Sequence, residues 1–213
     1  MIATVKTVLT SEVLTSRRFI IVTINFKLEN TYFSMATTIG KIAVAAAAGI
    51  AAFSLLLLII SVATPVWLDA GSGNTIGLFR QCVGSGTGNS GCVNQNRDPQ
   101  AGLSVFGLLL LAFAIIVAIA SIFIEKLPIL YGALGLLYFS SVFVMSAYAT
   151  FGVYSRDPGA YFFPYLQTVN NPYTNVGYSY NLCVASHYFL WTALTLLAFG
   201  AGYKVAEERS ATT

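Results

Sequence analysis

The chain has 213 residues, of which 56% are hydrophobic and only 9% are charged, and its formal net charge is +3. A soluble domain carries roughly 25% charged residues, and a globule of this length could not hide so much apolar surface from water. A chain that crosses a bilayer several times can, because lipid solvates its outer faces. The small net charge gives no basis for nucleic-acid binding, which needs a clustered basic face.

The first 34 residues differ in character from the rest. Arg17 and Arg18 precede a short apolar run, 19–24, which is too short to cross a membrane. A secretory signal peptide would need a longer apolar region and a small-residue cleavage site. Met35 offers a second start immediately before the first long apolar stretch. We therefore interpret residues 1–34 as a disordered tail or a non-native extension, with a cleaved signal peptide as the alternative.

Four uncharged stretches follow, each long enough to span a bilayer, which takes about 20 apolar residues. They are rich in Ala and Gly, which let helices approach closely in lipid. The predicted spans cover about residues 42–64, 101–124, 127–154 and 178–203. We therefore predict an all-α membrane protein, with one four-span domain over 35–206 and a short cytoplasmic tail over 207–213.

The connections between these spans are unequal in length, and this fixes a topology. Long loops cover about 65–100 and 155–177, whereas only Glu125 and Lys126 separate the second and third spans. Both long loops therefore lie on one side of the membrane and both termini on the other. Basic residues are denser on the side of the termini, which favours cytoplasmic termini, extracellular loops and a multi-pass protein of the plasma membrane.

Two of the three cysteines, Cys82 and Cys92, lie in the first long loop on either side of a glycine-rich segment. Disulfides persist outside the cell, and the glycines allow the chain to return tightly. A zinc site is the other use of paired cysteines, but no third and fourth ligand lies nearby in the sequence. We predict a disulfide that joins the two strands of a hairpin. Cys183, in the fourth span, is expected to be a buried core thiol.

A motif now becomes visible around these cysteines. Trp67 follows the first span, and then come Gly77-Leu78-Phe79, Cys82 and Cys92. This order resembles the superfamily of claudins, epithelial membrane proteins, peripheral myelin protein and the calcium-channel gamma subunits, whose first extracellular loop carries Trp, then Gly-Leu-Trp, then two cysteines. The start of the fourth span, residues 177–180, is also similar to theirs. The resemblance covers about residues 35–206, with an aromatic Phe79 in place of the last Trp of the motif.

The resemblance implies a left-handed four-helix transmembrane bundle topped by a small extracellular antiparallel β-sheet. The first long loop would supply most of its strands and the second long loop one more. Trp67 would lie where the sheet meets the membrane, either as an interfacial anchor or packed in the core of the loop. An invertebrate claudin-like protein fits the chain, which has no glycosylation sequon in its long loops. Because the chain ends in Thr-Thr, attachment to a PDZ scaffold is not expected.

Residues able to carry chemistry are scarce. The four predicted spans contain no Asp, Glu, Lys or Arg, although such residues usually mark the substrate pathways of transporters. His187 is the only histidine, and a single histidine without a nucleophile and an orienting carboxylate does not make a catalytic site. We expect it to be a hydrogen-bonded residue of the bundle. The prediction is a protein that is not an enzyme, with no catalytic residues, cofactor or metal ligands.

The second long loop is instead rich in aromatic residues, which give a large contact area at low entropic cost. Packing on the sheet or in the headgroup layer is the alternative use of these side chains. The candidates for a contact surface are Tyr161, Phe162, Phe163, Tyr165 and Tyr173.

Two functions are compatible with these features, because a fold alone does not determine function. The leading hypothesis is a non-catalytic structural protein of cell–cell contacts, with claudin-like adhesion or a paracellular barrier. Such a protein would associate with copies of itself in one membrane, and with copies on the opposing cell. The alternative is an auxiliary subunit that binds an ion channel or receptor, as the calcium-channel gamma subunits do.

Overall fold

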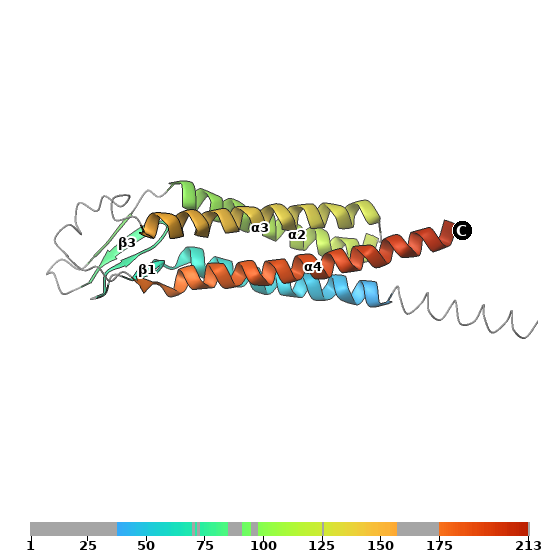
Figure 1. Ribbon diagram of the computed structural model, residues 1–213, viewed down its shortest axis with the longest axis horizontal. Helices are drawn as coiled ribbons and strands as arrows, with labels where there is room; N and C mark the ends of the chain where they lie inside the picture. Colours follow the sequence, from blue (N-terminus) through green and yellow to red (C-terminus); the bar gives the residue numbers. More distant parts are fainter. Residues whose placement is uncertain are drawn as a thin grey trace, which may run out of the picture.

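Four helices run side by side as an elongated bundle, and a small antiparallel sheet lies at one end of it (Figure 1). The computed structural model describes residues 38–69, 71, 73–84, 91–94, 98–124, 126–156 and 175–212. All four helices are long and apolar enough to cross a membrane. The predicted fold class, a four-helix bundle with a small sheet, is therefore confirmed. We call the end that carries the sheet the sheet end, and the other the opposite end.

The helices follow the apolar stretches but extend beyond some of them. They are the first helix, Thr38–Ala63, then α2, Asp98–Ile124, α3, Leu127–Arg156, and α4, Tyr178–Thr212. The first helix begins four residues before the predicted span, and α4 continues through most of the segment predicted as a tail. The residues after Tyr203 include Lys, Ala, Glu and Arg, which are good helix formers. Helical structure therefore persists where apolar character ends.

The sheet joins the two long loops. Its strands are β1, Leu68–Asp69, β2, Thr75–Ile76, β3, Arg80–Val83, β4, Gly91–Asn94, and β5, Asn175–Val176. They are ordered β4-β3-β2-β1-β5, and every pairing is antiparallel. The first long loop thus supplies four strands and the second supplies one, as the resemblance implied.

Serine side chains connect the first helix to α4 inside the bundle. Ser54 Oγ donates to the carbonyl of Ser186 at 2.8 Å, and Ser186 Oγ donates back to the carbonyl of Ser54 at 3.1 Å. One repeat nearer the sheet end, Ser61 Oγ donates to the carbonyl of Ser179 at 2.7 Å. Each helix therefore contributes two serines seven residues apart, and the two helices are fixed in one antiparallel register.

The same spacing of small residues continues toward the opposite end. Seven residues from the serines, Ala47 and Ala193 are both buried. Seven residues further are Gly40 and Gly200, where a Cβ on Gly200 would lie 3.2 Å from the carbonyl oxygen of Gly40 and 2.7 Å from Val44 Cγ2. We call these eight residues, from Gly40 to Ser61 and from Ser179 to Gly200, the small-residue seam. A strict seven-residue spacing is the pattern of left-handed helix packing.

The α2–α3 hairpin packs by the same means. Ser140 Oγ donates to the carbonyl of Gly107 at 2.8 Å, and a Cβ on Gly107 would lie 2.9 Å from Val144 Cγ2. Ala114 on α2 and Ala133 on α3, each seven residues from this contact, are fully buried. Because lipid offers no hydrophobic force between helices, close contact at small residues is the main source of association.

Candidate functional site

The first element of the site is the β3–β4 hairpin. Cys82 and Cys92 lie directly opposite each other in the two strands, with 4.0 Å between their Cα atoms, and they form a disulfide. The predicted disulfide is confirmed, and the bond removes both thiolates as zinc ligands. In the part of the chain that the structure describes, no group of three or more His, Cys, Asp or Glu residues could hold a metal ion. Cys183 is a buried free thiol, as predicted.

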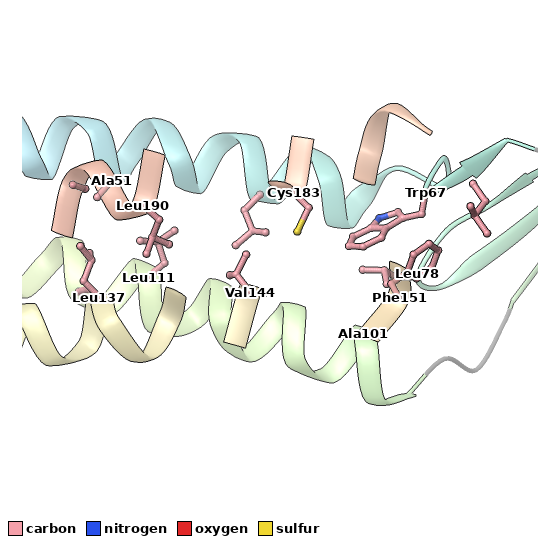
Figure 2. Packing of buried hydrophobic residues seen from close by; sticks show 14 of the residues in the cluster. Ala51, Trp67, Leu78, Ala101, Leu111, Leu137, Val144, Phe151, Cys183 and Leu190 are labelled. Carbon is pink, nitrogen blue, oxygen red and sulfur yellow. The ribbon is translucent and has the colours of Figure 1, made fainter. Parts of the chain in front are cut away.

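Trp67 lies where the bundle meets the sheet, and its side chain is fully buried. The centroid of the indole lies 4.8 Å from that of Phe151 and 5.8 Å from that of Tyr180, both in edge-on geometry. Figure 2 shows Trp67 beside Leu78 and Phe151 at the end of the helical core, next to the strands. Of the two roles left open by the sequence, packing in a core is the one that the structure shows.

A proline explains why the indole takes this position. In an uninterrupted helix the carbonyl of Ser61 would accept from the backbone nitrogen of residue 65, but Pro65 carries no N–H. The Nε1–H of Trp67 donates to this carbonyl instead, at 2.9 Å. The proline thus ends the first helix, and the tryptophan two residues later satisfies the acceptor that the proline leaves free.

The backbone on both sides of Trp67 is bonded to the rest of the junction. Trp67 N donates to the carbonyl of Ile76 at 2.8 Å, and Gly177 N donates to the carbonyl of Trp67 at 2.9 Å. Ser179 N, at the start of α4, donates to the carbonyl of Val66 at 3.0 Å. The segment that leaves the first helix is therefore held between β2 on one side and the start of α4 on the other.

Two glycines allow this close approach. A Cβ on Gly77 would lie 2.5 Å from Pro65 Cα, and a Cβ on Gly177 would overlap the carbonyl oxygen of Val66. Any side chain at either position would push the 65–67 segment away from its partners. The glycine of the Gly77-Leu78-Phe79 motif is therefore required by packing, because only glycine lets two backbones come this close.

The other two residues of that motif differ in environment. Leu78 is buried in the same core as Trp67, whereas the side chain of Phe79 is 45% exposed. Phe79 and Arg80 line a groove whose other walls include Ile59 of the first helix and Leu108 of α2. Trp67, Gly77 and Leu78 thus build the junction, and Phe79 remains on an accessible surface.

The sheet also has an accessible edge that the sequence analysis did not single out. All four residues of β4 are exposed, with Val93 at 68%, and β4 is the outermost strand of the described sheet. An outer strand presents backbone N–H and C=O groups that another strand can pair with. The signal available in the sequence was an apolar Val93 next to a disulfide-bonded Cys92, in a hairpin that is otherwise polar.

The aromatic residues predicted as a contact surface, Tyr161, Phe162, Phe163, Tyr165 and Tyr173, lie outside the described residues, as does the segment 1–34. Those two interpretations remain predictions.

His187 is hydrogen-bonded inside the bundle, as expected. Trp191 Nε1 lies 2.9 Å from His187 Nε2, and an indole nitrogen can only donate, so Nε2 is the acceptor and carries no proton. Nδ1 then carries the proton of the neutral imidazole and lies 3.1 Å from the hydroxyl of Tyr148. Ser141 Oγ also lies 3.1 Å from Nε2. Both ring nitrogens have partners that suit a structural role between α3 and α4.

Comparison with known proteins gives no match, either to a protein-family model or to a curated protein. The likeness to the claudin superfamily therefore depends on the motif residues and on the arrangement they adopt at the junction.

Proposed function

We propose that this protein is a non-catalytic structural component of cell–cell contacts, similar to the claudins, with its sheet outside the cell. The observation that supports this most is the way the sheet is held. A disulfide joins β3 to β4, and the buried Trp67 junction fastens β1 and β2 to the helices. A surface held in place before binding loses little conformational freedom on binding, which suits a protein whose function is contact.

Exposed features at the sheet end supply the surfaces for such contact. Strand β4 offers an unshielded edge with Val93 at its centre, and Phe79 lies beside a groove bordered by the first helix and α2. We propose that β4 contributes to association between copies of the chain through the sheet. The groove at Phe79, which lies next to two spans, suits association side by side in one membrane.

The distribution of basic residues supports the orientation. Lys41, Lys126, Lys204 and Arg209 all belong to the opposite end, where the first helix begins, α2 turns into α3 and α4 ends. Among the described residues of the sheet end, Arg80 is the one basic side chain. Because basic residues near span ends stay in the cytoplasm, we propose cytoplasmic termini, an extracellular sheet and residence in the plasma membrane.

Imaging of a fluorescently tagged chain in a mixture of expressing and non-expressing cells tests the proposal. We expect enrichment at borders between two expressing cells, above the level at borders with non-expressing cells. Uniform distribution over the surface would contradict the contact role. It would favour the auxiliary-subunit alternative, for which co-purification of a channel or receptor would be the next measurement.

A pair of variants on one strand sharpens this test. Val93→Lys places a charge at the exposed apolar position of β4, and Asn94→Lys places the same charge on the next residue, which points to the other face of the sheet. We expect Val93→Lys to lower border enrichment at unchanged surface amount, and Asn94→Lys to leave it near the level of the unmodified chain. Equal effects of the two substitutions would show that charge alone, and not this face of β4, determines enrichment.

A further inference from the structure

A pocket lies at the opposite end of the bundle, where all four helices contribute to its walls. The first helix supplies Lys41 and Val44, α2 supplies Ile122, the turn into α3 supplies Lys126, and α4 supplies Lys204. Three of the five lysines in the chain therefore line one pocket, although they are separated by up to 163 positions in the sequence.

The charge of this pocket is unbalanced. Glu207 is the one acidic residue among its lining residues, and it pairs with Lys204 at 3.5 Å. The lining therefore keeps an excess of two positive charges from Lys41 and Lys126. Both of these side chains are exposed, so they can follow a ligand that enters the pocket. Such an excess favours an anion over a neutral or zwitterionic group.

The depth of the pocket in the bilayer is also informative. Lys126 lies between the last residue of α2, Ile124, and the first residue of α3, Leu127, where two apolar spans end. This is the level of the lipid headgroups. The walls also include the apolar side chains of Val44, Ile122 and Leu130. A ligand with both a charged head and an apolar chain would contact both kinds of wall.

We propose that this pocket binds the phosphate-bearing headgroup of an anionic phospholipid, with the lysines around the phosphate and an acyl chain along the apolar wall. Inorganic phosphate would use the lysines but gain nothing from Val44, Ile122 and Leu130. Phosphatidylcholine would bring a cation toward lysines. The proposal concerns the opposite end alone, and it holds whether or not the sheet end forms cell contacts.

Native mass spectrometry of the full chain in a neutral detergent tests this binding. Palmitoyl-oleoyl phosphatidylserine and palmitoyl-oleoyl phosphatidylcholine are added in separate samples at equal concentration, and the fraction of protein that retains a lipid is measured. We expect clear preference for phosphatidylserine, and no displacement by an equal concentration of inorganic phosphate. Equal retention of the two lipids, or displacement by phosphate, would overturn the proposal.

Three substitutions and one control identify the pocket. A basic residue near a membrane surface contributes about fivefold to the binding of an anionic lipid. Lys41→Gln and Lys126→Gln should therefore each lower phosphatidylserine retention about fivefold, and Glu207→Gln should raise it. Arg209→Gln makes the same charge change on α4 outside the pocket and should have little effect. Retention unchanged in the two lysine variants, or lowered equally by Arg209→Gln, would contradict a specific site.

A folding control accompanies these variants. Cys183 is a buried free thiol, so a thiol-reactive dye reports the temperature at which the bundle opens. Lys41 and Lys126 are exposed, and we expect their Gln variants to open at the temperature of the unmodified chain when no lipid is added. Added phosphatidylserine should raise that temperature in the unmodified chain more than in either variant. An equal rise in all three proteins would count against the pocket.

Discussion

Trp67 shows how one side chain can complete both a helix end and a core. Its ring fills the space between Phe151 and Tyr180, and its N–H satisfies the carbonyl of Ser61 that Pro65 leaves without a donor. The sequence indicated an aromatic residue at the membrane boundary but not its direction, because an indole suits both an interface and a polar corner of a core. The deciding partners, Phe151 and Tyr180, are more than 80 residues away in the chain.

Substitution of Trp67 separates its two contributions. Trp67→Phe keeps an aromatic ring but leaves a buried carbonyl without its donor, which should cost about 1–3 kcal/mol. Trp67→Ala also removes the packing and should cost about 3–5 kcal/mol. Thermal opening followed through the thiol of Cys183 measures both, with Phe79→Leu as a control at an exposed aromatic of the same motif. A Trp67→Phe protein that opens with the unmodified chain would show that the hydrogen bond is dispensable.

The disulfide gives a second prediction for single residues. Cys82 and Cys92 are separated by 10 positions, and closing a loop of this size stabilises by about 2.8 kcal/mol on the chain-entropy account. Cys82→Ser and Cys92→Ser should each cost a similar amount, and the double variant little more, because either change already opens the bond.

The defect should appear as retention inside the cell or lost contact enrichment, and not as lost membrane insertion, because the apolar spans are unchanged. Cys183→Ser serves as the control and should be mild, since that thiol forms no disulfide. Non-reduced peptide mass spectrometry checks the bond directly. A free thiol at Cys82 in surface-delivered protein would refute this prediction.

Among the elements, the first helix and α4 are matched along their whole contact. Individual hydrogen bonds between helices in a membrane contribute only about 0.6 kcal/mol on average. The serine pairs of the small-residue seam therefore contribute more to register than to total stability. Close contact over eight small residues supplies the rest, and it depends on the absence of side-chain volume at the glycine end.

Two glycines on α4 provide a matched test of this contact. A Cβ on Gly200 would meet Val44 and the carbonyl oxygen of Gly40, whereas a Cβ on Gly202 would meet nothing within 4 Å. Gly200→Leu should separate the first helix from α4 and lower the opening temperature strongly. Gly202→Leu should have little effect or stabilise, because leucine favours a helix more than glycine does. Similar behaviour of the two variants would show that the seam does not limit stability.

The ease of prediction differed between these elements for physical reasons. Spans could be located because an apolar run of sufficient length has one stable environment. Strands β1, β2 and β5 have two residues each, too few for an alternating pattern to emerge. The serine pairs join positions 118 and 132 residues apart, and nothing in the local sequence identifies such partners. At the junction, the motif residues were identifiable, but their division into buried Leu78 and exposed Phe79 was not.

For the molecule as a whole, orientation is the property most open to test. A C-terminal tag should be labelled by antibody only after permeabilisation, because the basic residues of the opposite end favour the cytoplasm. An epitope inserted between Val83 and Gly91, in the loop that joins β3 to β4, should be labelled in intact cells and serves as the control. Labelling of the C-terminal tag in intact cells would reverse the proposed orientation.

The pairing of the first helix with the last has a consequence for biosynthesis. Ser54 and Ser61 acquire their partners only when Ser179 and Ser186 have been synthesised, and β1 gains β5 only just before that. Until then the α2–α3 hairpin can form, but the first helix has polar groups without their final partners inside the membrane. The ribosome must therefore deliver the fourth span before the bundle can close. Chaperones that recognise unpaired serines in lipid would retain any chain interrupted upstream of residue 178.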